Sequence, residues 1–330
     1  MPVHTFTRGI SALILLAIVA SAYPAPAQPD KTVRLIFVGD IMLDDLPGKA
    51  IARGVDPFAD FATLFGRADA VIGNLECVVS TRGEAERKPY TFRADPRVIP
   101  LLQKHFAAVA VANNHSGDFG KEALREQCDL LEAAGLPYCG GGRNAAEARR
   151  PAIIERGGLR IALLSYNDFP PKRFEAGPDS PGIAWIREAD LVADVRDARA
   201  RHAADIVIPF LHWGVEYRPR PLPEQRELAR KLIDAGATAV IGGHPHVIQP
   251  VEVYRGRVIA YSLGNFVFDG FDEGPERWGW ALTLTLRRSQ GAFSTTWTAA
   301  YAHIDDDGLP HLRQPPSRPG KPARCRLRRS

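Results

Sequence analysis

Cysteine is scarce in this chain of 330 residues, and four are present. They are Cys77, Cys128, Cys139 and Cys325. No two of them form a CxxC pair or show the spacing of a zinc site, so we expect no thiolate metal centre. Cys128 and Cys139 flank the end of a predicted helix and could form a disulfide in an exported protein, and the sequence leaves this open. Cys77 is interpreted as a small buried residue.

The chain has one long apolar run, over residues 10–20, and no second one. His4 and Arg8 precede it and Ala25-Pro26-Ala27 follows it, which resembles a secretory signal peptide cleaved after Ala27. The run is short for a membrane-spanning helix, and no nearby cysteine indicates a lipoprotein. We predict a signal peptide over residues 1–27 and a soluble, exported chain, periplasmic or extracellular. An uncleaved membrane anchor is the alternative.

Acidic residues are absent from the last twenty positions. Residues 311–330 contain seven Lys or Arg, and the rest of the chain has 35 basic and 38 acidic residues. A tail rich in Pro and Arg is typical of a disordered segment. The sequence also lacks a repeat of solenoid length, a Gly-x-Ser-x-Gly elbow and a nucleic-acid-binding motif. We predict one domain over residues 28–310, a disordered basic tail over 311–330, and no nucleic-acid partner.

One local pattern recurs in the predicted domain. An apolar run rich in Val, Ile and Ala is followed at once by polar residues that can bind a metal. The runs are residues 34–38, 70–73, 109–112, 206–211, 239–243 and 259–262. Their length and composition are typical of strands buried on both faces. Ligands of α/β sheets gather at the carboxyl ends of strands, so the pattern predicts a site at one edge.

Helical patterns separate these runs. Residues 121–134 and 223–235 have apolar residues at helical spacing, and each segment ends before a glycine. Asp56-Pro57 and Asp95-Pro96 are typical of helix starts. This alternation predicts an α/β domain. In residues 281–286 and 294–298, apolar and polar residues alternate along the chain. This pattern predicts an antiparallel hairpin that turns at Ser289-Gln290-Gly291, and therefore a mixed sheet.

The polar residues after the runs form a ligand set for divalent cations. They are Asp40, Asn74, Glu76, His115, His212, His244 and His246. Two neighbouring divalent ions need about this many protein groups, with a carboxylate able to bridge them and open positions left for water or substrate. Imidazole, amide and carboxylate suit zinc, manganese or iron. We expect one or two such ions, which would lower the pKa of a bound water.

Within this set, the most specific indication of a metal site is His244-Pro245-His246. In an extended segment the two histidines point the same way, and the proline between them stiffens the backbone. The other members have ordinary interpretations when taken singly. Gly-Asp is common in turns, Asn74 and Glu76 could cap a helix or loop, and His212 could be a packed core residue. Their shared position after predicted strands favours the metal site.

Six motifs together resemble the CapA family of capsule-synthesis proteins, which is associated with making or exporting poly-γ-glutamate. The resemblance covers residues 33–271. The motifs are Gly39-Asp40-Ile41-Met42-Leu43, Gly73-Asn74-Leu75-Glu76, Ala112-Asn113-Asn114-His115, His212-Trp213-Gly214-Val215-Glu216-Tyr217, Gly243-His244-Pro245-His246-Val247 and Tyr261-Ser262-Leu263-Gly264-Asn265-Phe266-Val267-Phe268.

That family is similar to calcineurin-like metallophosphoesterases, which implies an α/β sandwich of mixed sheets flanked by helices. The resemblance implies that Asn114 binds metal and that His115 stabilises charge or protonates a leaving group. Two departures stand out. Met42 replaces the histidine of the usual first motif, so one metal site loses a ligand. Asp44-Asp45 replaces the Gly-Arg of many relatives. An arginine there could hold an anionic group of a substrate, and two aspartates could not.

These observations favour an exported, metal-dependent, hydrolase-like protein of capsule or exopolymer metabolism. Asp118, Glu216 and Asn265 are candidates for orienting the imidazoles. The expected substrate is an anionic polymer or a phosphoester, and membrane-bound synthase subunits are expected partners. Met42 favours a second hypothesis, a non-catalytic subunit with a structural metal. A cytosolic phosphatase is a third hypothesis, which requires that residues 1–27 are not a signal peptide.

Overall fold

The computed structural model describes residue 1, residues 30–289 and residues 292–314. The predicted signal peptide, the turn residues Gln290 and Gly291, and residues 315–330 of the predicted tail lie outside these ranges. Within them, no helix combines the length and apolarity that crossing a bilayer would need.

The first sheet contains eight strands and is mixed. Its order is β18 (Pro310–Arg313), β17 (Ala292–Ile304), β16 (Trp278–Ser289), β1 (Lys31–Ile41), β2 (Ala70–Leu75), β5 (Ala108–Ala110) and β6 (Tyr138–Cys139), with β15 (Asn265–Val267) also paired to β1. The strands from β1 to β6 run parallel, and β16, β17 and β18 are antiparallel. The predicted hairpin is therefore present as β16 and β17.

The second sheet contains six strands. Its order is β13 (Val251–Tyr254), β14 (Arg257–Ala260), β12 (Ala239–Gly243), β11 (Ile206–His212), β9 (Leu159–Asn167) and β8 (Ala152–Arg156). The four inner strands are parallel, and the two outer strands pair antiparallel with their neighbours. The inner strands are almost wholly buried, as their continuous apolar runs predict.

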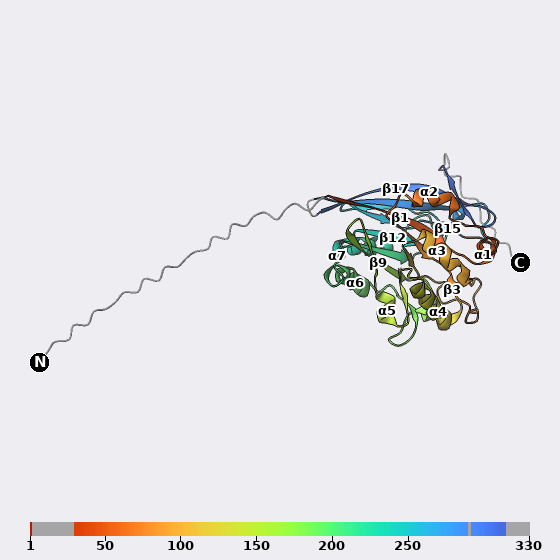
Figure 1. Cartoon of the computed structure of the whole chain (residues 1–330), viewed down its shortest axis with the longest axis horizontal. Coiled ribbons are helices and arrows are strands. Elements are labelled where there is room, and N and C mark those ends of the chain that lie inside the picture. The colour runs from red at the N-terminus through yellow and green to blue at the C-terminus, as the bar shows by residue number, and fades with distance from the viewer. Residues whose placement is uncertain (2–29, 290–291, 315–330) are drawn as a thin grey trace.

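The two sheets pack face to face through one apolar core. Phe37 of β1 meets Phe210 of β11 edge-on across this interface, with ring centroids 6.2 Å apart. The outer face of the first sheet packs against α1 (Asp45–Ala52), α2 (Ala62–Phe65), α3 (Ile99–His105) and α4 (Gly120–Ala133). The outer face of the second packs against α5 (Ala145–Arg149), α6 (Glu188–Ala200) and α7 (Pro223–Ala235). Figure 1 shows α6 and α7 beside β9 and β12. The predicted α/β sandwich of mixed sheets is confirmed.

Short elements complete the fold. They are η1 (Ala59–Phe61), β3 (Val78–Val79), β4 (Arg93–Ala94), η2 (Pro96–Val98), β7 (Gly141–Gly142), η3 (Lys172–Phe174), β10 (Gly182–Ile183) and η4 (Pro275–Arg277). The helix start predicted at Asp95 is present, because its carboxylate accepts a hydrogen bond from the amide of Arg97 and η2 leads into α3. The start predicted at Asp56 is followed only by η1 and α2.

Two details differ from the predictions, and one question that the sequence left open is answered. The strand expected over residues 109–112 is β5, which ends at Ala110, so the Asn113 to His115 segment begins in a turn. His311 to Arg313, which were assigned to the predicted tail, pair with β17 as part of β18. Among the described residues, Cys128 and Cys139 are buried free thiols and do not form a disulfide with each other.

Candidate metal centre

The carboxyl ends of strands from both sheets meet at one edge of the sandwich. Asp40 is the penultimate residue of β1 in the first sheet, and His244 follows β12 of the second. The amide of His244 donates a hydrogen bond to Asp40 Oδ2 at 3.1 Å. Gly243 permits this approach, since a Cβ atom there would lie 2.5 Å from Asp40 Oδ1. The Gly243-His244 step therefore joins the two sheets at the site.

Asp40, Asn74 and Glu76 form the part of the site contributed by the first sheet. The Asn74 side-chain amide donates to Asp40 Oδ1 at 2.8 Å and to Glu76 Oε2 at 3.4 Å. All three side chains are buried. The Asn113 side-chain amide in turn donates to Asn74 Oδ1 at 3.1 Å. The Asn74 side chain is thus held by its neighbours and spaces the two carboxylates.

His212, at the end of β11, lies between these residues and the turn after β5. Its Nδ1 is 3.2 Å from the Asn74 side-chain nitrogen, and its Nε2 is 2.7 Å from Asn114 Oδ1. Glu76 Oε1 lies 3.6 Å from the same Nε2 atom. His212 Nε2 therefore lies between the Asn114 side-chain oxygen and the Glu76 carboxylate.

His244 and His246 sit in an unusual backbone. Their φ angles are 94° and 56°, in the left-handed region that few non-glycine residues adopt. His246 Nδ1 lies 2.8 Å from Asn265 Oδ1, and its Nε2 lies 3.8 Å from Glu76 Oε1. Both ring nitrogens of His244 are buried without a hydrogen-bond partner among the described residues. The strained turn brings both rings into the site and leaves the His244 nitrogens available.

Two ligand groups can be drawn from these residues, and they share one member. Asp40, Glu76 and His246 form one group, and Glu76, His212 and His244 form the other. In each group the ligand atoms lie within 4.8 Å of one another. Glu76 is therefore placed to bridge two cations, while Asn114 stands beside the second group.

Burial shifts the titration of this cluster strongly. It raises the pKa of Glu76 well above its ordinary value, and the charge of Asp40 adds to the effect. Burial raises the pKa of Asp40 as well. It lowers the pKa of His212 and of His244 well below the usual histidine value, with neighbouring imidazoles adding to the effect. Neutral imidazole is the form that binds a metal, and a cation would favour the ionised carboxylates.

These residues fit divalent cations. A buried polar atom without a partner costs free energy, and Glu76 Oε1 and both His244 nitrogens lack a hydrogen bond within the described residues. A bound cation would satisfy all three atoms. Imidazole and carboxylate without thiolate suit zinc, manganese or iron, as the sequence predicted. The ligand roles of individual residues stay predictions.

Met42 stands at the position where the resemblance expects a histidine, and it is not a member of either ligand group. Its side chain is fully buried, and its sulfur accepts a hydrogen bond from the amide of Asp44 at 3.1 Å. Asp44 belongs to none of the ligand groups found among the described residues, and its carboxylate accepts a hydrogen bond from the amide of Arg93 at 2.6 Å. Three protein ligands with an open position are typical of catalytic metal sites.

His115 lies against a buried ion pair. Its Nδ1 is 2.7 Å from Asp118 Oδ2, and Asp118 also forms an ion pair with Lys88. The Lys88 ammonium donates to the carbonyl oxygen of Asn114 at 2.9 Å. The short contact to the carboxylate assigns the Nδ1 proton to His115 and leaves Nε2 as the atom that can exchange a proton with a substrate.

The three residues predicted to orient imidazoles all lie close to one. Asp118 contacts His115 and Asn265 contacts His246, each through a ring nitrogen. Glu216 differs, because its carboxylate lies within 4.8 Å of ligand atoms of both His244 and His246. It is thus a member of a third possible ligand group.

Two functional candidates were not found from the sequence. Lys88 comes from the irregular segment between β3 and β4, where no pattern marks it. Asp168 follows β9 beside the site, and burial raises its pKa to about 6. Phe169 stacks close to His244, with ring centroids 4.0 Å apart. The run at β9 followed by Asn167-Asp168 repeats the pattern of the other strands and could have identified Asp168.

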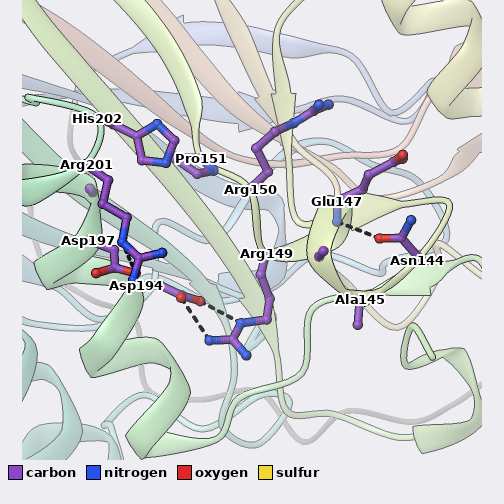
Figure 2. A pocket seen from close by; sticks show the side chains of 12 residues that line it. Asn144, Ala145, Glu147, Arg149, Arg150, Pro151, Asp194, Asp197, Arg201 and His202 are labelled. Carbon is purple, nitrogen blue, oxygen red and sulfur yellow. Dashed lines mark hydrogen bonds and ion pairs between the residues drawn. The ribbon is translucent and has the colours of Figure 1, made fainter. Parts of the chain in front are cut away.

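A separate hollow between α5 and α6, of about 650 Å³, contains none of the predicted site residues. Arg149 points to Asp194 there, with its Nε atom 2.8 Å from the carboxylate (Figure 2). Arg201 likewise lies 3.5 Å from Asp197. The charges that line this hollow are paired, whereas the cluster around Glu76 contains unpaired ligand atoms. The cluster is therefore the better candidate for a functional site.

Comparison with known families places the chain among capsule proteins. A family model described as "Bacterial capsule synthesis protein PGA_cap" matches residues 34–270. Two relatives are a PGA biosynthesis protein CapA of Bacillus subtilis, 34% identical over 73% of this chain, and a capsule biosynthesis protein CapA of Bacillus anthracis, 30% identical over 74%. The chain spans 64% and 62% of these relatives, respectively.

Other similarities are weaker. A Mycobacterium tuberculosis protein described as a probable polyglutamine synthesis accessory protein is 33% identical over 61% of this chain and 56% of its own length. Among solved structures, the Haemophilus influenzae NAD nucleotidase has a TM-score of 0.49 at 12% identity and covers 87% of this chain and 54% of its own. A Thermus thermophilus sulfate thiohydrolase has a TM-score of 0.44 at 13% identity, over 81% and 56%.

Proposed function

The chain belongs to the bacterial capsule synthesis protein family PGA_cap, and from this premise we propose that it is an exported, metal-dependent, hydrolase-like protein. It acts in the biosynthesis or export of a capsule or exopolymer of the poly-γ-glutamate type. The substrate is an anionic polymer or a phosphoester. The observation that carries the proposal is the placement of Glu76 in both ligand groups, beside imidazoles with unpaired nitrogens.

Each part of the cluster has a distinct task in this proposal. Asp40, Glu76 and His246 would hold one cation, and Glu76, Asn114, His212 and His244 would hold the other, with Asn74 spacing the carboxylates. Bound divalent ions supply Lewis acidity and lower the pKa of water, which suits hydrolysis of a phosphoester or an amide. Asp118 holds the Nδ1 proton of His115, so that Nε2 can donate to a leaving group or stabilise developing charge.

Export is supported by the composition of residues 1–27, with a charge-free apolar run followed by Ala25-Pro26-Ala27. Sequencing of the amino terminus of the protein from cells tests this part. We expect a chain that begins at Gln28. A chain that retains residues 1–27 and fractionates with the cytosol would contradict export.

The second candidate is a non-catalytic subunit that binds the polymer or a membrane-bound synthase and keeps its metal for structure. Met42 favours this candidate, because its thioether sulfur, which accepts a hydrogen bond from the Asp44 amide, binds zinc or manganese less well than an imidazole would. The names of the relatives, which include an accessory protein of polymer synthesis, agree with either candidate.

Elemental analysis of the purified protein beside His244→Ala and His246→Ala tests the metal centre. We expect zinc, manganese or iron in the wild type and a clear loss in both variants. Unchanged metal content in both variants would remove the proposed ligands. Hydrolysis of bis(4-nitrophenyl) phosphate by the metal-loaded wild type separates the two candidates: turnover supports the enzyme, and full metal content without turnover supports the non-catalytic subunit.

A further inference from the structure

Glu216 is held against the histidine turn by the backbone of its own loop. The loop leaves β11 after His212, and the amide of Trp213 donates to the carbonyl oxygen of Gly243 at 3.2 Å. Four residues later, the amide of Tyr217 donates to the carbonyl oxygen of Pro245 at 2.8 Å. Two hydrogen bonds therefore fix the segment that carries Glu216 alongside the segment that carries His244 and His246.

The backbone of the loop is shaped for this position. Gly214 has a φ angle of 95°, and a Cβ atom there would lie 2.7 Å from the side chain of Gln225. Tyr217 has a φ angle of 64°, which costs free energy for a residue with a side chain. The chain thus adopts two left-handed residues within four positions, and Glu216 lies between them.

The Glu216 carboxylate faces two ligands without bonding to either. Its oxygen lies within 4.8 Å of ring nitrogens of His244 and His246, and these two rings belong to the two different ligand groups. Within the described residues no hydrogen bond or ion pair joins Glu216 to either ring. A half-buried carboxylate next to unpaired imidazole nitrogens is placed to share a cation with them.

Glu216, His244 and His246 form a third ligand group, which contains neither Asp40 nor Glu76. We propose that Glu216 is a further metal ligand, whose carboxylate reaches the cation from the side of the His244-Pro245-His246 turn. It would share that cation with His244 and His246 and add a negative charge to the site. The inference rests on the proposed function, since it requires the metal centre.

Binding of manganese to the full, chelator-stripped protein tests this role, with free Mn²⁺ followed by electron paramagnetic resonance. Glu216→Gln keeps the shape of the side chain and removes its charge. Glu224→Gln, at an exposed position of the first turn of α7, is the matched control. His244→Ala reports on the metal centre itself. Thermal unfolding of each metal-free variant checks that the fold is intact.

We expect Glu216→Gln to weaken the more weakly held Mn²⁺ ion by more than about 100-fold, because loss of a direct ligand should exceed the roughly 10-fold to 100-fold effect of a residue that only orients a ligand. Glu224→Gln should bind as the wild type does. Wild-type binding in Glu216→Gln together with loss in His244→Ala would overturn the role of Glu216 and leave the metal centre standing. Absence of Mn²⁺ binding in the wild type would overturn the metal centre and the role of Glu216 together.

Discussion

Glu76 and His212 come from different sheets, yet Glu76 Oε1 lies 3.6 Å from His212 Nε2. Glu76 follows β2 in the first sheet and His212 ends β11 in the second. Both are almost completely buried. Burial raises the pKa of Glu76 and lowers the pKa of His212, so it favours the neutral form of each side chain. A core would not gain stability from such a pair alone, since desolvation of a charge costs more than the contact returns. The pair is understandable as part of a cation site.

Glu76→Gln should separate stability from metal binding. In the metal-free protein near pH 8, the substitution removes a buried group whose ionisation is costly, so the free energy of unfolding should rise by about 1 kcal/mol or more. The same change removes the shared carboxylate, so added Mn²⁺ should no longer raise the melting temperature. Calorimetry with and without chelator measures both effects. A metal-free variant less stable than the wild type would contradict the stated cost of Glu76.

Lys88 should be essential to the fold around His115. Lys88→Met leaves the buried Asp118 carboxylate without its cation, which should cost about 3–5 kcal/mol of unfolding free energy. Lys88→Met combined with Asp118→Asn should recover much of that loss, because no charge is then left unpaired. Urea unfolding of the four proteins in the cycle measures the coupling. Additive losses would show that the ion pair does not hold this segment.

The pH dependence of stability should contain a contribution from His115. Burial lowers the pKa of His115 to about 4. Below about pH 6.5 the unfolded chain therefore binds a proton at this residue that the folded chain does not. Stability is lost as the pH falls from about 6.5 to about 4, by about 3 kcal/mol for this residue. Urea unfolding in chelator across this range measures it.

His115→Gln should remove that part of the pH dependence, so the difference in stability between wild type and variant should shrink on acidification. His202→Gln, next to the surface hollow between α5 and α6, is the control. Parallel pH profiles for the wild type and His115→Gln would mean that His115 titrates alike in both states.

Gly243→Ala should damage the site more than the fold. The added Cβ atom would meet Asp40 Oδ1 at 2.5 Å, so the carboxylate must move. We expect a cost of about 1–3 kcal/mol in unfolding free energy and a loss of about 10-fold to 100-fold in metal affinity. Gly66→Ala is a suitable control, because Gly66 has a φ angle of −65° and its Cβ atom would meet nothing closer than 3.3 Å. Wild-type metal affinity in Gly243→Ala would mean that Asp40 is not a ligand.

Elements with strong local patterns could be predicted from the sequence. α7 begins at Pro223 and ends before Gly236, which adopts a φ angle of 116°, so both boundaries follow from residue chemistry. The six apolar runs led to the strands that carry the site, because parallel strands buried on both faces leave few polar positions except at their ends. The convergence of the histidines and carboxylates followed from that placement.

Other features depend on contacts between distant segments. Lys88 lies in an irregular segment, and its importance arises only where it meets Asp118 and the carbonyl of Asn114. Glu216 was expected to orient an imidazole, but the hydrogen bond from Tyr217 to Pro245 places its carboxylate among possible ligands. The packing of two sheets, rather than one, came from the resemblance and not from the alternation of strands and helices.

Crystals of the protein soaked with Mn²⁺ and measured for anomalous scattering test the central claim most directly. The account predicts two peaks roughly 3.5–4 Å apart, with the Glu76 carboxylate between them, Asp40 and His246 on one, and His212 and His244 on the other. Anomalous peaks that all lie beyond coordinating distance of Glu76, His212 and His244, in crystals where manganese is bound elsewhere, would contradict it.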